Sequence, residues 1–576
     1  MAELKQQCTA AVKKAVKTLY KIEVEPPIDA PAKEHDAASP VALMLGRQLK
    51  KNPVEIAQKI AEKINENLPE LVEKTDSLNG YVNFTAAEKF FSLSAEQSTE
   101  KNYGSTEQKA KKKGKQPSKK AIVEYSSPNV GKPLHVGHVR STIYGEAVKN
   151  LLLNQGWNVV GSNFLCEAGT QVAKLITGLR HYGAKKIKDE RELLEYYVKI
   201  NAEIEKNPAL GEEAQKVLQK MEAGEKQIAA ELKKVRELSI PPIETIYKEL
   251  NVKFDEEIFD SDYIEEGKKV VGEAIKAGIA FRDKNGEIVA KLEDYTPPLP
   301  NLIILRSNGT TLYSTRDLGL AEARWKKYKP DLSVIVTASD QNLHFKQFTK
   351  ILELLKKPIA HKIKHIGYGL VVLPEGKISS RAGRVVLLQD VIDEASAEAE
   401  SEILAREPDA GKKELKQRSR AIGIGALKFA VLKVSAEKNI TFDFKKMVSF
   451  EGDTGAYVQY SLVRCKSILR KAGEEKAKKK AVGGRYTYNT EERALLLQLA
   501  AFPDVLANSA RSLSPHTLCD YLLRTCAAFS TFYAAHSVLN AENEQIKTTR
   551  LQMVKATANV LERGLEILGI TAVEKM

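Results

Sequence analysis

A short apolar run followed by a loop with two histidines constrains the fold more than any other feature of the chain. Residues 121–125 are Ala-Ile-Val-Glu-Tyr, a pattern typical of a buried strand. After the loop, residues 143–152 place apolar side chains on one face of a helix, and residues 159–165 predict a second strand. Strand, loop, helix and strand in this order predict an α/β fold with a parallel sheet.

The loop itself predicts a phosphate site. His135 and His138 are three residues apart, so at the start of a helix they face the same way, and each ring can donate an N–H to phosphate oxygens. Gly137 between them lets a nucleotide approach the backbone, and a helix N-terminus favours anions. The alternative is two incidental surface histidines in a turn. A zinc site is less favoured, because no nearby Cys, His or Glu completes a ligand set.

The rest of the chain divides by pattern. Residues 1–100 predict an α+β module with a short strand at 80–84, and the lysine-rich residues 109–120 predict a linker. A charged helical insertion follows from about residue 186. Extended segments at 302–305, 332–337 and 369–373 predict the second half of the sheet, and the chain from 391 onward is predicted to be almost entirely helical. The lysine-rich stretch 476–480 is predicted to be a loop.

Composition narrows the class of protein. The 576 residues carry a formal net charge of +14, which favours a polyanionic partner, although a solvated basic surface explains it equally well. The five cysteines contain no C-x-x-C pair, so we expect neither a disulfide framework nor a thiolate zinc site. No apolar run approaches the roughly 18 residues of a membrane span, and the N-terminus lacks an apolar signal core; we therefore expect a cytoplasmic protein.

The histidine loop resembles the signature of class I aminoacyl-tRNA synthetases, and its flanking residues Ser126, Ser127 and 140–142 resemble arginyl-tRNA synthetases in particular. The signature region comprises Pro128, Asn129, Val130, Gly131, Lys132, Pro133, Leu134, His135, Val136, Gly137 and His138.

Residues 376–383, Gly-Lys-Ile-Ser-Ser-Arg-Ala-Gly, resemble the second signature of that family, a mobile K-M-S-K-S-like loop. Ser380 occupies the place of the second lysine. Many arginyl enzymes that lack it carry a lysine before the first histidine, so the resemblance implies that Lys132 supplies the missing charge. The catalytic and ATP-binding candidates are His135, Gly137, His138, Lys132, Lys377, Ser379 and Arg381.

A site for a guanidinium needs carboxylate, amide or phenol oxygens at fixed positions. Tyr313 and Asp317 are four residues apart, and we predict Thr315 as a helix N-cap with Asp317 in the first turn, which alone is also an ordinary capping arrangement. The segment matches the family motif Y-x-T-R-D. The resemblance implies that arginine is bound by Glu124, Asn129, Tyr313, Asp317 and Gln341.

Residues 163–171 correspond to the family motif N-H-x-G-D-W-G-T-Q, with Asn163 and Gln171 retained. The chain departs from that motif at Phe164, Cys166, Glu167 and Ala168.

The C-terminal part resembles the helical anticodon-binding domain of the same family. Exposed tyrosines and arginines suit unstacked RNA bases, although each tyrosine alone is more simply explained as a helix-packing residue. The tRNA-contact candidates are Tyr457, Tyr460, Arg464, Tyr533 and Met576.

We therefore expect an N-terminal tRNA-contacting module at 1–105, a linker at 106–120, a Rossmann-type catalytic domain at 121–390 with a helical insertion at about 186–280, a helical connection at 391–447, and an anticodon-binding domain at 448–576. The resemblance implies ATP-dependent attachment of L-arginine to tRNA(Arg) through an arginyl-adenylate. It also implies Mg²⁺ bound with ATP, no metal ligands from the protein, and a monomer that contacts no membrane. The alternatives are a tRNA-independent nucleotidyltransferase that adenylates a small acid, and a non-catalytic RNA-binding paralogue.

Overall fold

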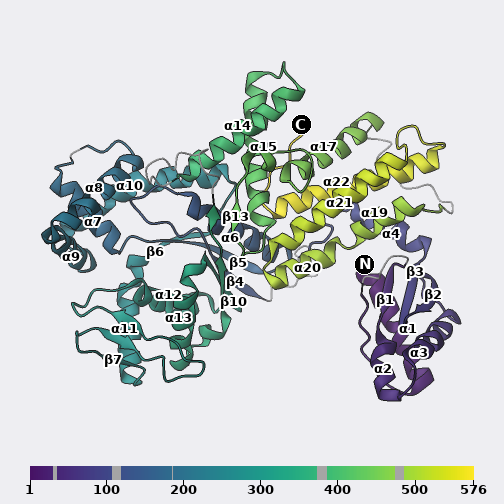
Figure 1. The fold of residues 1–576 in the computed structure, drawn as a ribbon, viewed down its shortest axis with the longest axis horizontal. Coiled ribbons are helices and arrows are strands. Elements are labelled where there is room, and N and C mark those ends of the chain that lie inside the picture. Colours follow the sequence, from purple (N-terminus) through teal and green to yellow (C-terminus); the bar gives the residue numbers. More distant parts are fainter. Residues whose placement is uncertain (30–34, 107–118, 185, 373–385, 474–485) are drawn as a thin grey trace.

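The structure, a computed structural model, describes residues 1–29, 35–106, 119–184, 186–372, 386–473 and 486–576. Figure 1 shows these parts as one elongated arrangement, with helices on both sides of a central sheet. Most of the predicted linker and the lysine-rich stretch 476–480 lie outside the described residues.

Five parallel strands form the central sheet, which confirms the predicted α/β fold. The strand order is β11-β10-β4-β5-β6. The members are β4 (Lys120–Glu124), β5 (Asn158–Leu165), β6 (Glu256–Phe259), β10 (Leu332–Ala338) and β11 (Ile363–Tyr368). Helix α6 (Val136–Asn154) connects β4 to β5, and the chain winds away in opposite directions from β4 and β10. Ligands of such sheets bind beyond the carboxyl ends of the strands at this switch point.

Two of the predicted sheet strands belong elsewhere. Residues 302–305 form β9 (Leu302–Leu305), which pairs antiparallel with β8 (Ile288–Ala290), and β8 pairs with β7 (Ala280–Arg282). Residues 369–373 include β12 (Val371–Val372), which pairs with β13 (Ile440–Thr441). The strands missed by the prediction, β6 and β11, are sheet edges whose charged residues weaken the apolar pattern.

The insertion is helical over a shorter range than predicted. Its helices are α8 (Glu190–Lys206), α9 (Pro208–Glu222) and α10 (Lys226–Glu249), which pack with α7 (Thr170–His181) around their own apolar core. The chain then returns to the central sheet as β6, inside the range predicted as insertion. Beyond β6 lie η1 (Asp260–Tyr263), α11 (Ile264–Lys276), α12 (Tyr313–Tyr328), η2 (Ser339–Gln341), α13 (Asn342–Leu354) and η3 (Pro358–Lys362).

The N-terminal module is a helix-covered antiparallel sheet. Its strands β1 (Ala37–Ser39), β2 (Val72–Leu78) and β3 (Tyr81–Ala86) are ordered β1-β3-β2, and β3 covers most of the strand predicted at 80–84. Its helices are α1 (Ala2–Tyr20), α2 (Val41–Leu49), α3 (Pro53–Asn65) and α4 (Glu88–Ser98).

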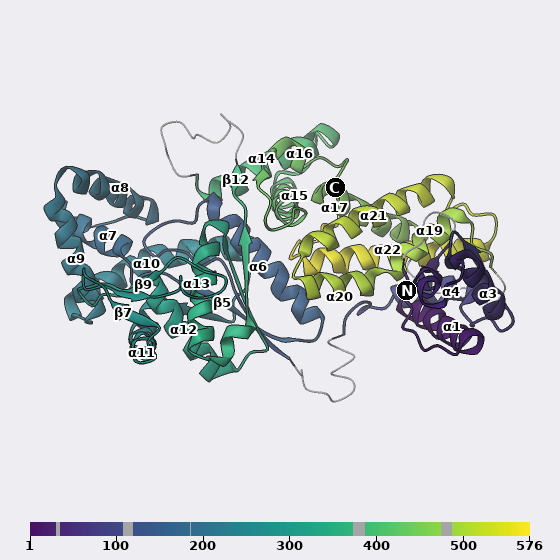
Figure 2. The same cartoon turned by 60° about the horizontal axis from the view of Figure 1, so that its bottom comes forward.

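Helices dominate the C-terminal part, as predicted. They are α14 (Leu388–Arg406), α15 (Lys412–Leu432), α16 (Phe444–Met447), α17 (Gly455–Ala472), α19 (Thr490–Ala500), α20 (Phe502–Ser512), α21 (Pro515–Ala535) and α22 (Glu544–Ile567). Figures 1 and 2 show the N-terminal module beside these helices, at the opposite end of the molecule from α7, α8 and α9. Helix α4 packs against α19 and α22, so one apolar core runs from the first helix into the central sheet.

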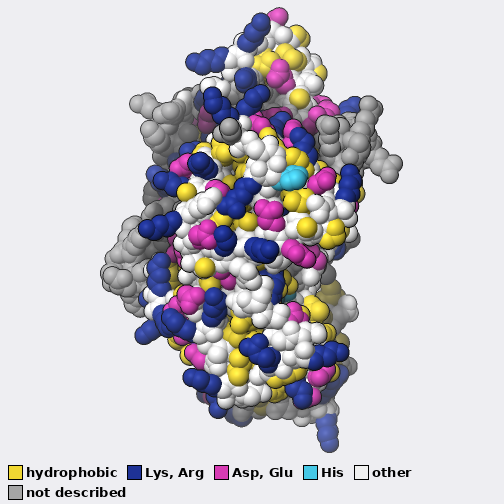
Figure 3. Space-filling model, turned by 90° about the vertical axis from the view of Figure 1, so that its left-hand side faces the viewer, with side chains coloured by type: hydrophobic (Ala, Val, Ile, Leu, Met, Phe, Trp, Pro, Cys, Tyr) yellow, Lys and Arg dark blue, Asp and Glu magenta, His cyan; other side chains and the backbone are white. Residues whose placement is uncertain are grey.

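Two surface properties follow from this arrangement. On the face of the insertion end drawn in Figure 3, Lys and Arg are interspersed with Asp and Glu, so the net positive charge is not gathered into one patch there. Of the helices described, none combines the length and apolar character that crossing a membrane requires.

Candidate active site

The two histidines of the predicted phosphate loop cap helix α6. His135 is the N-cap residue, and its Nδ1 accepts a hydrogen bond from the Gly137 N–H at 3.0 Å. His138 Nδ1 accepts from the His135 N–H at 3.1 Å. Because each Nδ1 is an acceptor, each ring is neutral and carries its hydrogen on Nε2. Burial lowers the pKa of both histidines, that of His138 to about 3.

Gly137 is required by the histidine pair itself. A Cβ at this position would lie 2.7 Å from His135 Cε1, closer than packed atoms approach. The glycine therefore gives the His135 ring room to fold back over the first turn. This contact between Gly137 and the His135 ring adds to the role expected from the sequence, in which the glycine makes room for the nucleotide.

The segments on either side of residues 373–385 lie next to the start of α6. His135 forms a β-bridge with Leu387, and the buried Arg140 guanidinium donates to the Gly369 carbonyl at 2.9 Å. Tyr368 donates through its hydroxyl to the Gly137 carbonyl at 3.2 Å. The candidates Lys377, Ser379 and Arg381 fall between these anchors, outside the described residues, so their roles stay predictions.

Lys132 contacts the helical insertion. Its Nζ donates to Gln171 Oε1 at 2.8 Å and lies 3.8 Å from the centre of the Tyr197 ring on α8. Burial lowers the pKa of Lys132, and its charge lowers the pKa of His135. The ammonium therefore lies near the histidines and against the insertion.

Tyr313 and Asp317 lie one turn apart on one face of α12, as their spacing predicts. The predicted cap is wrong, however. The N-cap is Leu312, and Thr315 is the third helical residue, where its Oγ1 accepts from the Leu312 N–H at 3.0 Å. Asp317 is the fifth residue of the helix, so it does not lie in the first turn as predicted. A Thr315 cap would start the helix at Arg316, whereas the helix begins at Tyr313.

His344, which the sequence argument did not single out, joins the two predicted arginine ligands. Its Nε2 lies 2.7 Å from Asp317 Oδ2, and its ring packs edge-on against Tyr313 with centres 4.6 Å apart. Gln341, half-buried, ends η2 directly after the carboxyl end of β10. Gln341 is the N-cap of α13 and His344 is the third residue of that helix, so their spacing of three was the indication in the sequence that both lie at one helix start.

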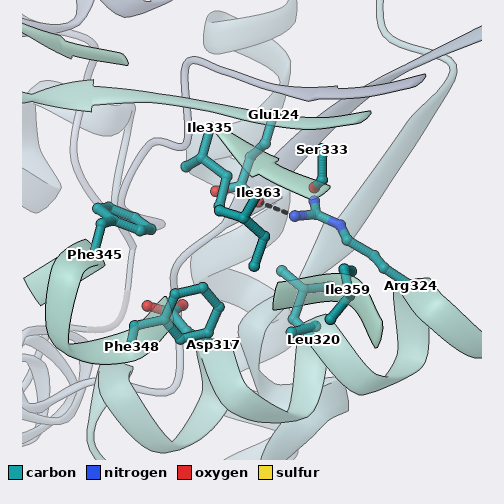
Figure 4. A pocket seen from close by; sticks show the side chains of 11 residues that line it. Glu124, Asp317, Leu320, Arg324, Ser333, Ile335, Phe345, Phe348, Ile359 and Ile363 are labelled. Carbon is teal, nitrogen blue, oxygen red and sulfur yellow. Dashed lines mark ion pairs between the residues drawn. The ribbon is translucent and has the colours of Figure 1, made fainter. Parts of the chain in front are cut away.

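Glu124 ends β4 and is already paired within the fold. Its Oε2 lies 2.5 Å from Arg324 Nη1, and Arg324 also donates to Ser162 Oγ at 3.1 Å. Burial raises the pKa of Glu124, and the Arg324 charge opposes that shift. Figure 4 shows Glu124, Arg324 and Asp317 lining one cavity whose other walls are mainly apolar. Among the described residues, Asp317 has no Lys or Arg partner.

The segment that departs from the family motif anchors the insertion. Asn129 pairs through its backbone with Cys166, and the buried Glu167 forms an ion pair with Arg236 of α10. The backbone N–H groups of Glu167 and Ala168 each donate to an Asp260 oxygen at 2.8 Å. In this chain, the segment is therefore tied to α10 and to η1.

The tRNA-contact candidates are partly packed. Arg464 of α17 is exposed and stacks over the Tyr533 ring of α21 at 4.5 Å. Tyr460 stacks parallel to Phe450 at 6.2 Å, while Tyr457 and Met576 are half-buried against the core.

Family models match nearly the whole chain. Residues 103–444 match the model described as tRNA synthetases class I (R), catalytic domain. Residues 2–86 match the arginyl tRNA synthetase N terminal domain, and residues 458–576 match the DALR anticodon binding domain.

Relatives and solved structures agree with these models. The arginine–tRNA ligase of Clostridium perfringens is 38% identical over 561 residues, covering 96% of each chain. That of Clostridium acetobutylicum is 36% identical over 573 residues, covering 97% of each. Thermus thermophilus arginyl-tRNA synthetase superposes with a TM-score of 0.79 at 27% identity, covering 100% of both chains. The Plasmodium falciparum enzyme, at 21% identity and a TM-score of 0.81, covers 100% of this chain and 99% of its own and shares the fold.

The switch-point sheet, the histidine-capped helix and the matched catalytic model define a class I aminoacyl-tRNA synthetase. Within that class, the chain belongs to the arginyl-tRNA synthetases. Its activity is that of a ligase that attaches arginine to tRNA, which confirms the predicted resemblance. Neither alternative, the nucleotidyltransferase or the non-catalytic paralogue, is favoured by these matches.

Proposed function

We propose that His135 and His138 bind the phosphates of ATP and that the chain activates arginine as an arginyl-adenylate before transfer to tRNA. A carboxylate oxygen of arginine attacks the α-phosphorus, and pyrophosphate leaves with the electrons of the broken P–O bond. A hydroxyl of the terminal tRNA ribose then attacks the carbonyl carbon, and AMP leaves. No side-chain nucleophile is needed, so the chain contributes positioning and charge stabilisation.

The observation that carries this proposal is the acceptor role of both Nδ1 atoms. Each histidine caps the first turn of α6 through Nδ1, which leaves two Nε2–H donors at a helix N-terminus. Neutral rings donate without the desolvation cost of a buried charge, and the positive end of the helix dipole favours an anion there. We assign Mg²⁺ to the phosphates, as part of the ATP substrate.

We assign the guanidinium of arginine to Tyr313, Asp317 and Gln341, with Glu124 and Asn129 near the amino and carboxyl groups. The partners of the two carboxylates support this division. Glu124 is neutralised by Arg324, whereas the Asp317 charge is available to a cation. Because no described Lys or Arg pairs with Asp317, its carboxylate favours a positively charged ligand such as a guanidinium.

We assign the charge built up on the leaving pyrophosphate to Lys132, Lys377, Ser379 and Arg381. The Lys132 charge acts on His135, and its ammonium is held by Gln171 and the Tyr197 ring. The tRNA is assigned to the N-terminal module and to the helical domain, with Tyr457, Tyr460, Arg464, Tyr533 and Met576 at the anticodon end. We propose that the chain acts as a monomer in the cytoplasm.

Arginine-dependent exchange of pyrophosphate into ATP, with and without tRNA, tests the assignment. We expect H138A to slow exchange by about a hundredfold, the usual effect of removing one donor to a developing charge. Binding of tRNA stays within about twofold in a filter assay. The matched control is H181A, an exposed histidine on α7. Full exchange activity in H138A would contradict the nucleotide site.

A further inference from the structure

We propose that His344 is a positioning residue for arginine recognition, which holds the Asp317 carboxylate and the Tyr313 ring in the orientation that receives the guanidinium. The inference deepens the proposed function and rests on its assignment of Tyr313 and Asp317 to the arginine side chain. His344 itself contacts those two residues and is not assigned to the substrate.

One ring contacts both candidate ligands. His344 Nε2 lies 2.7 Å from Asp317 Oδ2, and the ring centre lies 4.6 Å from that of Tyr313 at an interplanar angle of 68°. The three side chains come from two helices, since α13 supplies His344 and α12 supplies the others. A change in the His344 ring would therefore move the carboxylate and the phenol together.

The His344 ring has little freedom to turn. It is 5% exposed, and it packs against Phe345 at 5.0 Å and against Phe348 at 6.1 Å. Asp317, in contrast, sits at the end of a short flexible side chain on the cavity wall. The packed histidine is thus the fixed partner and the carboxylate is the group that it orients.

Only one of the two nitrogens of the His344 ring has a hydrogen-bond partner among the described residues. Nε2 faces Asp317, whereas Nδ1 is buried with no partner among the residues that the structure describes. A buried polar atom without a partner costs stability, so an apolar side chain here would cost the fold less. The hydrogen bond between His344 and Asp317 is therefore the feature that a histidine adds at this position and an apolar residue would lack.

The bond also leaves the carboxylate able to bind a ligand. His344 engages Oδ2, and no described donor bonds Oδ1 of Asp317. A planar guanidinium can donate to the remaining oxygen and to the Tyr313 hydroxyl, and the half-exposed Tyr313 is accessible to it. Without His344, the carboxylate would rotate among several orientations and bind the cation less tightly.

Variants at His344 test the inference through the KM values of pyrophosphate exchange. H344L removes the donor, and we expect the KM for arginine to rise at least about tenfold, as for loss of a hydrogen bond to a charge. The KM for ATP stays within about twofold, because the histidine pair is untouched. H344Q restores a donor near the Nε2 position and recovers most of the affinity, whereas H344N, which is too short, does not. If H344L fails to fold, the comparison of H344N with H344Q replaces it.

The control is H365L. His365 stacks on the same Phe345 at 4.2 Å and bonds Thr337, but it does not contact Asp317. We expect its KM for arginine to stay within about twofold of the wild type. An equal rise in H365L and H344L would show a general packing effect and overturn the inference.

A double-mutant cycle separates this inference from the proposed function. Because His344 acts through both Asp317 and Tyr313, H344L added to D317N should raise the KM for arginine by clearly less than H344L does in the wild-type background. If the fold-changes in the KM for arginine caused by H344L and by D317N simply multiply in the double variant, the positioning role is wrong. An unchanged KM for arginine in H344L alone would also contradict it. Neither result would contradict the proposed arginine site. An unchanged KM in D317N would remove the proposed arginine site and the inference together.

Discussion

The histidine pair shows how one residue type can serve structure and chemistry with its two nitrogens. In His135 and His138, Nδ1 satisfies backbone donors that the first turn of a helix leaves open, and Nε2 remains for a ligand. Capping also selects the tautomer, so the ring orientation needs no further partner. The cost is that both rings must stay neutral to keep their caps.

This cost predicts a pH dependence of stability. The pKa of His138 is lowered from 6.5 to about 3, so between these values the unfolded chain binds a proton that the folded chain does not. The stabilisation is therefore present above pH 6.5 and lost as the pH falls toward 3. Between about pH 7.5 and about pH 5, the wild type should lose up to about 2 kcal/mol more unfolding free energy than H138N.

Urea unfolding at the two pH values measures that difference. Asn at position 138 keeps a side-chain acceptor for the His135 N–H but does not titrate. H181N, which alters an exposed histidine, should keep the wild-type pH slope. Equal slopes in wild type and H138N would mean that His138 is not held neutral.

At the scale of elements, the position of α6 depends on a close contact with the end of β4. A Cβ on Gly145 would lie 2.1 Å from Tyr125 Cβ, so only glycine allows the helix to lie this near to the residue that follows the strand. Tyr125 is fixed in turn by a hydrogen bond from its hydroxyl to Glu146 Oε2 at 2.6 Å. The contact between Gly145 and Tyr125 in the middle of α6 therefore helps to fix the position of the two histidines at its start.

We expect G145A to move α6 away from β4. Overpacking of a dense core costs about 1–3 kcal/mol, and the displaced histidines should raise the KM for ATP. G272A is the matched control. Gly272 lies in α11, where an added Cβ would meet open space, so alanine there should stabilise by about 0.5–1 kcal/mol through helix propensity. Thermal unfolding and exchange kinetics distinguish the two, and an unperturbed G145A would contradict the packing argument.

At the scale of the whole molecule, polar contacts dock the N-terminal module on the C-terminal helices. Arg493 of α19 bonds Glu88 at 3.1 Å and the Ala86 carbonyl at 2.8 Å. Asn559 of α22 bonds the Ser98 carbonyl at 2.8 Å, and Arg563 bonds the Tyr103 carbonyl at 3.1 Å. A tRNA that contacts both parts would therefore bind a preassembled surface.

If the N-terminal module contacts tRNA, as we propose, loosening this docking should weaken tRNA binding selectively. R493A removes two of the contacts, and we expect the KM for tRNA to rise by about threefold to tenfold. The KM values for arginine and ATP should stay unchanged in exchange assays at saturating tRNA. K5A is the control, since Lys5 pairs with Asp504 across the same contact at 3.6 Å and is partly exposed, and such pairs contribute little. A rise in the KM for arginine would contradict a purely docking role.

Some features of this chain follow from local sequence alone. The strand β4, the start of helix α6 at the histidine loop and the helical character of residues after 391 were predicted correctly, because apolar periodicity acts over a few residues. The class of protein was also predicted, because its signature around His135 and His138 is contiguous in the chain.

Other features depend on contacts between distant segments, so only the tertiary structure decided them. Whether a short extended segment joins the central sheet depends on its neighbours, and so β6 and β11 are members while β9 and β12 are not. Glu124 pairs with Arg324, which lies 324 − 124 = 200 positions later in the chain. Asp317 pairs with His344, which lies 344 − 317 = 27 positions later. No local pattern encodes such a pairing, because it arises when helices and strands pack and bury charges that must find partners.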